Sequence, residues 1–495
     1  MIEVRNFIPR AYQENIAHAS LARNTLVVLP TGLGKTKIAI LLAVCRLNEF
    51  SGSSILVCSP TKPLSSQIYQ EFIESTNIPG EKVCLLTGLI SPDKRRKLLE
   101  NSLVIIATPQ TIESDLENKR ISLENFSMLC IDEAHRSGPN FANTNVARIY
   151  NKQSRFPRIL ALTASPGSTK EKIGGICSNL FIESVQIKTE DDDDVKEYIQ
   201  KRKIDWIIVE LPKDYEEIIS LISFVYREKL KSLRSYGILK PVSLINKKDL
   251  LLFQRNFQRG INERDKLSYS GISLISQLLK LNHAIELIGT QGIDSFRQFM
   301  KKVYGETSKA SISIKNNINI IKAYDMARKT EMAHPKLSKL AEIVAGRFNS
   351  NESSKIIIFS KYRNSVKEIV KNLNGLKGIK AIELLGQKEG ITQKKQIGII
   401  KDFENGIYNV MVTSNIGEEG ISIEGGSLCI FFDQVYGIRR IQRAGRVART
   451  MPGEIIYLIT KGTMDEGMYW KSRKDISMMT YNLKKMQNEG QTGLI

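Results

Sequence analysis

One stretch, Leu29 to Thr36, constrains the fold of this chain more than any other. It reads Leu-Pro-Thr-Gly-Leu-Gly-Lys-Thr, it follows the apolar run Thr25–Leu29, and it precedes helical apolar spacing from Lys37. A glycine-rich turn between a strand and a helix presents backbone N–H groups and the positive end of the helix to a bound phosphate. The stretch therefore predicts a nucleotide-binding loop on an α/β sheet.

Each residue type in this loop has a chemical reason to be there. Gly32 and Gly34 let the backbone approach the ligand without a Cβ, Lys35 would reach the β- and γ-phosphates, and the Thr36 hydroxyl would ligate Mg²⁺. The strict pattern G-x-x-x-x-G-K-[ST] has glycine where this chain has Leu29, so the match is to a variant form. A chance Gly-Lys-Thr in a turn is the alternative, and the strand-to-helix context disfavours it. The predicted cradle comprises Thr31, Gly32, Leu33, Gly34, Lys35 and Thr36.

Apolar strands alternate with helices on both sides of a central region that has a different pattern. Strands are predicted near 54–58, 82–86, 103–107, 128–131 and 158–162, with a last strand of the first domain at 206–212. From 213 to 329 the apolar spacing is helical, and strands return at 355–359, 381–385, 409–413, 428–432 and 454–459. Continuous apolar strands that alternate with helices indicate parallel sheets covered on both faces. A charged helix is expected after Trp470.

We therefore predict an α/β protein with three domains, as expected for a chain of 495 residues. Residues 1–212 would form the first sheet domain, 213–333 a helical insertion, and 334–495 the second sheet domain. Polar motifs follow the carboxyl ends of the predicted strands, which is where open α/β sheets bind ligands.

The charge balance favours a polyanionic partner. The chain has 72 Lys and Arg against 52 Asp and Glu, and residues 201–340 alone hold 26 against 14. A basic but merely solvated surface is the alternative. Aromatic residues interleaved with these cations would either stack on nucleic acid or pack in a helical core, and both readings stay open. They are Tyr226, Tyr236, Phe253 and Phe257.

Several features indicate a cytosolic protein. The six cysteines are scattered without a Cys-x-x-Cys pair, so we expect buried thiols and not disulfides or zinc ligands. The amino terminus has no signal-peptide layout, and no apolar run is long enough to span a membrane. The acidic run from Glu190 to Asp194 is expected to be a solvated loop, because consecutive carboxylates do not make a metal site.

Nucleotide hydrolysis also needs a metal holder, a base for water and a cation for the developing charge. Asp132 would hold Mg²⁺, and Glu133 beside it would orient and deprotonate the attacking water. Arg443, Arg446 and Arg449 are spaced three apart on a predicted helix of the second domain, where they would act on ATP as arginine fingers. Binding nucleic acid or a surface role is the alternative for these arginines.

The ordered set of motifs resembles that of superfamily 2 helicases of the DEAH type. Within that superfamily, the chain is most similar to the archaeal Hef helicase and its FANCM relatives. The motifs that carry the resemblance are Gln13, Thr31–Thr36, Pro60–Leu64, Thr108–Gln110, Asp132–His135, Thr163–Ser165, Thr413–Gly420 and Gln442–Arg449. The resemblance implies two RecA-like domains with an inserted, thumb-like helical domain.

The resemblance also assigns roles. Gln13 would contact adenine with Arg10 nearby, and Gln442 would act with Arg446 and Arg449 on the phosphates. Coupling of nucleotide state to strand movement would use His135, Thr163, Ser165 and Gly420. The backbone of one DNA strand would be lined by Thr61, Lys62, Thr108, Pro109, Thr413 and Gly417. Two departures from the family pattern are Ser422, where relatives often have Asp, and Ala448, where Gly is common.

The expected activity is that of an ATP- and Mg²⁺-dependent DNA helicase or translocase that remodels forks and Holliday-type junctions in repair. Hef-like proteins often carry a nuclease domain, which is not expected in this chain, so a separate XPF-like nuclease and a sliding clamp are the expected partners. Localisation would be cytoplasmic, at the nucleoid. Two other readings are an RNA-directed ATPase like the RIG-I-like receptors and an ATP-gated clamp that recruits a nuclease.

Overall fold

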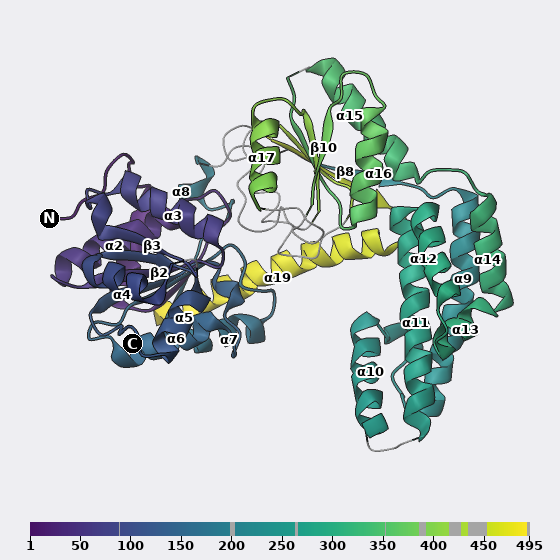
Figure 1. Ribbon diagram of the computed structural model, residues 1–495, viewed down its shortest axis with the longest axis horizontal. Coiled ribbons are helices and arrows are strands. Elements are labelled where there is room, and N and C mark those ends of the chain that lie inside the picture. The colour runs from purple at the N-terminus through teal and green to yellow at the C-terminus, as the bar shows by residue number, and fades with distance from the viewer. Residues whose placement is uncertain are drawn as a thin grey trace.

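The computed structural model describes residues 1–88, 90–198, 203–262, 266–351, 353–385, 393–414, 427–433 and 453–492. It has three parts, which Figure 1 shows side by side: a first sheet domain, a second sheet domain and a helical arm. The α/β class and the helical insertion predicted from sequence are confirmed. No described helix combines the length and the apolar character that crossing a membrane requires.

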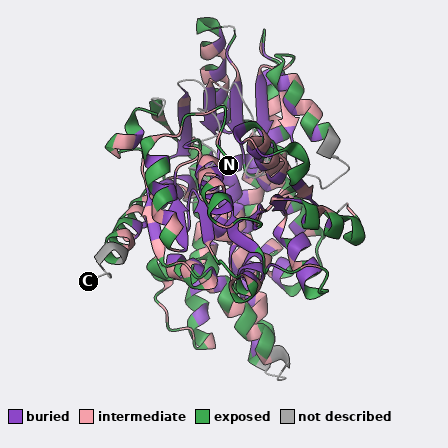
Figure 2. Ribbon diagram, turned by 90° about the vertical axis from the view of Figure 1, so that its left-hand side faces the viewer, coloured by how far each residue is buried: buried purple, intermediate pink, exposed green. Residues whose placement is uncertain are grey.

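The first domain is a parallel sheet between two layers of helices. Its seven described strands have the order β3-β4-β2-β5-β6-β1-β7. Their bounds are β1 Thr25–Val28, β2 Ser54–Cys58, β3 Val83–Leu86, β4 Val104–Ala107, β5 Phe126–Ile131, β6 Ile159–Thr163 and β7 Ser184–Ile187. The helices are α1 Ala11–Ala22, α2 Lys35–Glu49, α3 Lys62–Ser75, α4 Pro92–Asn101, α5 Pro109–Glu117, α6 Ala142–Gln153, α7 Lys170–Asn179 and the short α8 Asp193–Lys196. Strands β1, β4 and β5 are buried along their whole length, as a sheet covered on both faces requires, and Figure 2 shows buried strands beside helices with exposed outer faces.

The predicted last strand of the first domain was assigned to the wrong sheet. The strand is β8, Lys203–Val209, and it pairs in parallel with β13 at the edge of the second sheet. The first sheet instead ends with β7, a strand that the sequence analysis missed. An apolar strand pattern shows that a strand is half-buried but not which sheet buries it, and chain order favours the wrong neighbour here. A boundary at residue 212 therefore cuts this strand from its own domain.

The second sheet has the described order β10-β11-β9-β12-β13-β8. Its further strands are β9 Ile356–Phe359, β10 Ala381–Leu384, β11 Val410–Thr413, β12 Leu428–Phe431 and β13 Glu454–Thr460. Its helices are α15 Pro335–Ser350, α16 Arg363–Asn374, α17 Gln393–Glu404 and the long α19 Met464–Thr492. The predicted charged helix after Trp470 is the greater part of α19.

The described residues of the insertion form helices joined by turns and contain no strand. It contains α9 Lys213–Lys231, α10 Lys247–Asn262, α11 Lys266–Gln291, α12 Ile293–Gly305, α13 Lys309–Lys315 and α14 Ile318–Lys329. The four aromatic residues that were predicted either to stack on nucleic acid or to pack in a helical core lie in the apolar cluster between α9, α10 and α11. The ring centres of Tyr236 and Phe257 lie 5.8 Å apart, edge to face. The prediction that these residues pack in a helical core is confirmed.

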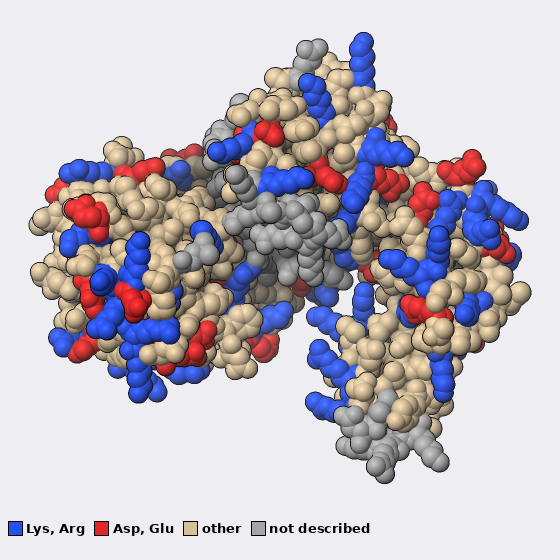
Figure 3. All heavy atoms as spheres, viewed as in Figure 1, with Lys and Arg blue, Asp and Glu red and all other residues tan. Residues whose placement is uncertain are grey.

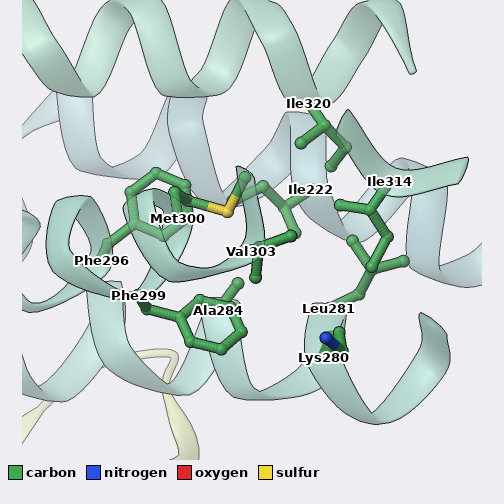
Figure 4. Close-up of a pocket in the computed structure, with 10 residues that line it drawn as sticks. All are labelled: Ile222, Lys280, Leu281, Ala284, Phe296, Phe299, Met300, Val303, Ile314 and Ile320. Atoms are coloured by element: carbon green, nitrogen blue, oxygen red, sulfur yellow. The ribbon is translucent and has the colours of Figure 1, made fainter. Parts of the chain in front are cut away.

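One small cavity lies in the interior of the bundle. Figure 4 shows apolar side chains, among them Phe296, Met300 and Ile320, around a cavity of about 10 Å³. This volume is about that of one water probe, and the walls are apolar, so the cavity is a packing defect.

The predictions for the cysteines and for the acidic run are confirmed only in part. Cys58, Cys84, Cys130 and Cys429 are buried thiols as expected, whereas Cys45 is exposed. The acidic run is not a plain solvated loop, because Asp192 caps α8, accepts a hydrogen bond from the Thr189 hydroxyl at 2.9 Å and lies 3.5 Å from Lys484 of α19.

A buried polar network joins the insertion to the second sheet domain. Glu286 of α11 accepts hydrogen bonds from Lys361 Nζ at 2.5 Å and from the Tyr362 hydroxyl at 2.7 Å, just past the end of β9. Gln291, near the end of the same helix, contacts Asp433, which also accepts from the Ser360 hydroxyl at 2.7 Å. These contacts fix the arm to the carboxyl end of the second sheet.

His334 lies in this junction as a buried N-cap of α15. Its Nδ1 accepts a hydrogen bond from Lys336 N at 3.1 Å, and its Nε2 faces the Gly289 carbonyl at 3.3 Å. Burial, with the charge of Lys336, lowers the pKa of His334 to about 3. Between about pH 3 and the pKa of about 6.5 of an unfolded histidine, the folded protein therefore holds this imidazole neutral while the unfolded chain protonates it.

The junction should accordingly weaken on acidification. Because the unfolded state binds the proton below a pKa of about 6.5 and the folded state does not, stability present at pH 7 should fall by about 2 kcal/mol at pH 5. Urea unfolding can be followed by the fluorescence of Trp206 and Trp470, the only two tryptophans, which both lie on the second sheet domain. In His334→Asn the side chain still caps the helix but does not titrate, so this variant should lose less stability between the two pH values. An equal loss in both proteins would contradict the assignment.

Candidate nucleotide-hydrolysis site

The phosphate loop lies between β1 and α2, as predicted. Gly34 caps α2 in the left-handed conformation, with φ 71°, and Gly32 has φ 94° with open space where a Cβ would stand. Lys35 Nζ donates to the carbonyls of Leu29 and Pro30, at 3.1 and 3.4 Å, so its ammonium lies inside the loop. A glycine backbone beside open space, a helix N-terminus and an inward ammonium together fit a phosphate ligand.

The residues predicted to contact adenine hold the same loop. Gln13 Nε2 and the Tyr12 hydroxyl both donate to the Leu33 carbonyl, at 3.2 and 2.8 Å. Gln13 Oε1 accepts from Arg10 N at 3.0 Å, and the Arg10 guanidinium lies 4.4 Å from the ring centre of Tyr198. Gly34 has a positive φ of 71°, which favours glycine, and a Cβ there would come within 2.5 Å of Gln13 Nε2, so the Gln13 side chain would have to move away from the loop. Sequence reasoning missed Tyr12, although its place beside Gln13 at the helix start was a usable signal.

The predicted metal holder and base follow β5 at the same edge of the sheet. Asp132 N donates to the Cys58 carbonyl at 2.8 Å, and its carboxylate accepts from the Ser59 hydroxyl at 3.3 Å. Burial and the neighbouring Glu133 raise the pKa of Asp132, and the Lys35 ammonium partly offsets this. Ser59 is the second residue that sequence reasoning missed, and its place at the end of β2 was the available signal.

Glu133 has an uncommon backbone for its residue type. Its φ of 51° and ψ of 48° are left-handed, a conformation that costs a non-glycine residue free energy and clusters at functional sites. Glu133 Oε2 lies 3.3 Å from His135 Nδ1, which in turn lies 3.2 Å from the Thr163 hydroxyl. The Thr163 hydroxyl also accepts from Ser165 N at 3.0 Å. The structure thus brings Glu133 and three predicted coupling residues into one chain of contacts.

The residues predicted to contact a DNA strand differ in their exposure and in their hydrogen bonds. Lys62 is exposed at the start of α3, and the neighbouring Thr61 hydroxyl is shielded and has no hydrogen-bond partner in the described part of the chain. The Thr108 hydroxyl pairs with the Thr111 hydroxyl at 2.8 Å, and Pro109 is buried. The Thr413 hydroxyl is buried and donates to the Leu384 carbonyl at 3.1 Å, so a phosphate contact there would have to use the backbone.

The remaining predicted residues, Gly417, Gly420, Gln442, Arg446 and Arg449, lie outside the described residues. Their roles stay predictions. The described site thus consists of the first domain's phosphate loop, the Asp132–Glu133 pair and the contacts behind them.

The arrangement can perform hydrolysis of a nucleoside triphosphate. Glu133 would hold the attacking water and take its proton, while Lys35 and the loop N–H groups would stabilise charge on the phosphate oxygens. Thr36 and Asp132 would hold Mg²⁺, which when bound supplies charge neutralisation to the phosphates. The hydrogen bond from Ser59 keeps the Asp132 carboxylate oriented for that role.

Each of the three parts of the chain matches the profile of a known helicase domain. The profile of the DEAD/DEAH box helicases matches residues 10–173, and that of the helicase conserved C-terminal domain matches residues 335–451. Between them, residues 214–334 match a profile described as the helical bundle of an ATP-dependent RNA helicase.

Individual relatives extend over nearly the whole chain. A Methanocaldococcus jannaschii protein described as an ATP-dependent RNA helicase is 38% identical, over 95% of this chain and 60% of its own length. The ATP-dependent DNA helicase mph1 of Neurospora crassa is 33% identical, over 92% of this chain and 41% of its own length. This chain therefore spans less than two thirds of the length of either curated relative.

A solved structure matches in full. The crystal structure of the Hef helicase domain of Pyrococcus furiosus has 40% sequence identity and a TM-score of 0.75, covering 94% of this chain and 98% of that one. Sequence identity and fold agree over both sheets and the insertion. The chain belongs to the Hef- and FANCM-like branch of the superfamily 2 helicases, a family of ATP-dependent enzymes.

Proposed function

We propose that this protein is an ATP-driven motor that moves on DNA and remodels forks and four-way junctions during repair. The observation that supports it most is the edge of the first sheet, where the phosphate loop follows β1 and Asp132 and Glu133 follow β5. ATP with Mg²⁺ would be the fuel. Motors of this type convert closure between two domains into movement along a strand.

The surface of the insertion supports a nucleic-acid substrate. On α10, the exposed residues Lys248, Arg255 and Arg259 recur at helical spacing and share one face, while the single acid of the helix's described side chains, Asp249, is paired with Lys240 at 2.7 Å. We call these three residues the α10 stripe. Figure 3 shows Lys and Arg side chains along the edge of the arm that faces the first sheet domain. A row of cations on one face, with no ion pair to another described residue, suits a phosphate backbone.

RNA is the second candidate substrate. The descriptions of the Methanocaldococcus relative and of the helical-bundle profile both name an ATP-dependent RNA helicase. The motor residues are the same for both substrates, because strand contacts of this class go to phosphates and not to bases.

A clamp that grips a junction and recruits a nuclease is a third candidate, since clamping uses the same motor. Within the main proposal, a separate XPF-like nuclease and a sliding clamp would be the partners that complete repair. Strand displacement measured beside ATP hydrolysis distinguishes a clamp from a motor.

Steady-state ATP hydrolysis with matched nucleic acids tests the substrate. Single-stranded DNA, duplex DNA, a fork, a four-way junction and duplex RNA would be compared at equal nucleotide concentration. We expect the fork and the junction to stimulate turnover most, with displacement of the fork's strand. Stimulation by duplex RNA alone would contradict the DNA assignment, and stimulation without displacement would favour the clamp.

The α10 stripe should contribute to binding of the fork through its charge. Replacing Lys248, Arg255 and Arg259 with alanine should lower the salt dependence of fork binding by about one unit of slope per residue that contacts a phosphate. Fluorescence anisotropy at several salt concentrations measures this slope. The matched control replaces three exposed cations of α14, Lys322, Arg328 and Lys329, on the outer side of the arm in Figure 1. Equal losses in both triple variants would show that only total charge matters.

A further inference from the structure

Helix α19 connects the two sheet domains. Its first residues lie in the second sheet domain, and its last turns pack on the first. It begins at Met464, just after β13, and in Figure 1 it runs in yellow from beneath the second domain to the first. Met479 and Leu483 are buried in the apolar core of the first sheet domain. The two motor domains are therefore joined by a continuous helix.

Polar contacts fix the far half of α19 to the first domain. Gln487 Oε1 accepts a hydrogen bond from Ile187 N, in the edge strand β7, at 3.2 Å. Asn482 Nδ2 donates to the Ser168 carbonyl at 3.0 Å. Ser168 ends the segment that starts at Thr163, which is the segment in contact with His135 and, through it, with Glu133.

A contiguous chain of contacts thus runs from the water-activating carboxylate to a helix of the other domain. It passes from Glu133 to His135 and Thr163, along the backbone to Ser168, and across to Asn482. Packed side chains and hydrogen bonds of this kind transmit displacement between sites when a rigid element moves.

The structure leaves room for such movement. A cavity of about 350 Å³ lies where α19 meets both sheets. Its walls include Pro30 and Ala164 from the nucleotide edge of the first sheet, Ile455 and Tyr457 from β13, and Met479 from α19. Closure of the second domain toward the first would take place across this space.

We propose that Asn482 is a positioning residue through which α19 transmits the position of the second domain to the Thr163–Ser168 segment and so to Glu133. The inference rests on the proposed function, because it explains how nucleic-acid binding by both domains accelerates hydrolysis. Asn482 does not touch the nucleotide. Its effect should appear in the stimulation of hydrolysis and not in the binding of ATP.

Two isosteric substitutions on the same helix separate this role from a general charge effect. Asn482→Asp removes the N–H donor to Ser168, whereas Gln487→Glu keeps an acceptor oxygen for Ile187 N. Each adds one negative charge to α19 within five residues of the other. Asn482→Asp should reduce the ratio of DNA-stimulated to basal turnover about fivefold or more, the scale of a coupling between sites, with the KM for ATP unchanged. Gln487→Glu should keep the wild-type ratio.

A second measurement does not depend on activity. Hydrogen exchange of the backbone amides from 163 to 168, in the protein without nucleotide, should be faster in Asn482→Asp and unchanged in Gln487→Glu. Wild-type stimulation together with wild-type exchange in Asn482→Asp would overturn the proposal. Equal defects in both variants, or a parallel fall of basal turnover, would also overturn it. A wild-type protein that DNA does not stimulate would contradict the proposed function instead, and the exchange result would still decide the role of Asn482.

Discussion

Replacing Glu133 with glutamine should stop ATP turnover while leaving the binding of ATP and DNA intact. Glutamine keeps the size and hydrogen-bonding reach of the side chain but cannot accept the proton of the attacking water, and loss of a general base costs about 100- to 10,000-fold in rate. Phosphate release under saturating ATP measures the loss. Binding of a fluorescent ATP analogue and of forked DNA measures what is retained.

A companion substitution separates the roles of the two residues. Lys35→Ala should also stop hydrolysis, but with weaker ATP binding, because its ammonium lies within the phosphate loop. Glu117→Gln, on the exposed surface of α5, is the matched control and should behave as wild type. Wild-type turnover by a folded Glu133→Gln protein would show that Glu133 is not the base.

Replacing Lys336 with methionine should destabilise the second sheet domain by about 3–5 kcal/mol, because it leaves a buried carboxylate without its cation. Lys336 is fully buried, and its Nζ donates to Asp465 at 2.8 Å and to the Phe432 carbonyl at 2.8 Å, with Asp433 at 3.8 Å. Burial raises the pKa of Asp465, and the ammonium of Lys336 works against that rise. Because methionine retains most of the side-chain volume, the loss of stability measures the effect of removing the charge and not that of creating a cavity.

The double variant Lys336→Met with Asp465→Asn completes the measurement. If the pair is the source of the loss, removing the second charge should recover part of it, and the interaction energy of the cycle should be large. Urea unfolding followed through Trp206 and Trp470 reports the domain concerned. Additive losses would show that the two side chains act independently.

The chemistry of the first domain could be predicted from sequence because its signals are local. The phosphate loop needs glycine at two positive φ angles and a lysine at a helix start, and these requirements fall within eight consecutive residues. The same holds for Asp132 and Glu133, which follow directly after one buried strand. Local hydrogen bonding and side-chain reach determine such sites, and a pattern of residue types reports both.

Side-chain direction was less predictable than position. Pro109 and Thr413 occupy the predicted motifs, yet both residues are buried, and the aromatic residues of the insertion face a helical core. Residue type fixes which groups are available, but packing against elements distant in sequence decides which of them reach the surface. Tyr12 and Ser59 show the converse, since residues outside the predicted set complete the site.

The sequence by itself determined the place of the phosphate loop, the alternation of strands and helices, and the helical nature of the insertion, because periodicity and short motifs depend on near neighbours. Only the tertiary structure decided that β8 completes the second sheet and that α19 ends in the core of the first. Both facts depend on pairing between segments far apart in the chain. An apolar strand or helix face requires a partner to bury it, but its own pattern does not say which partner is nearest in space.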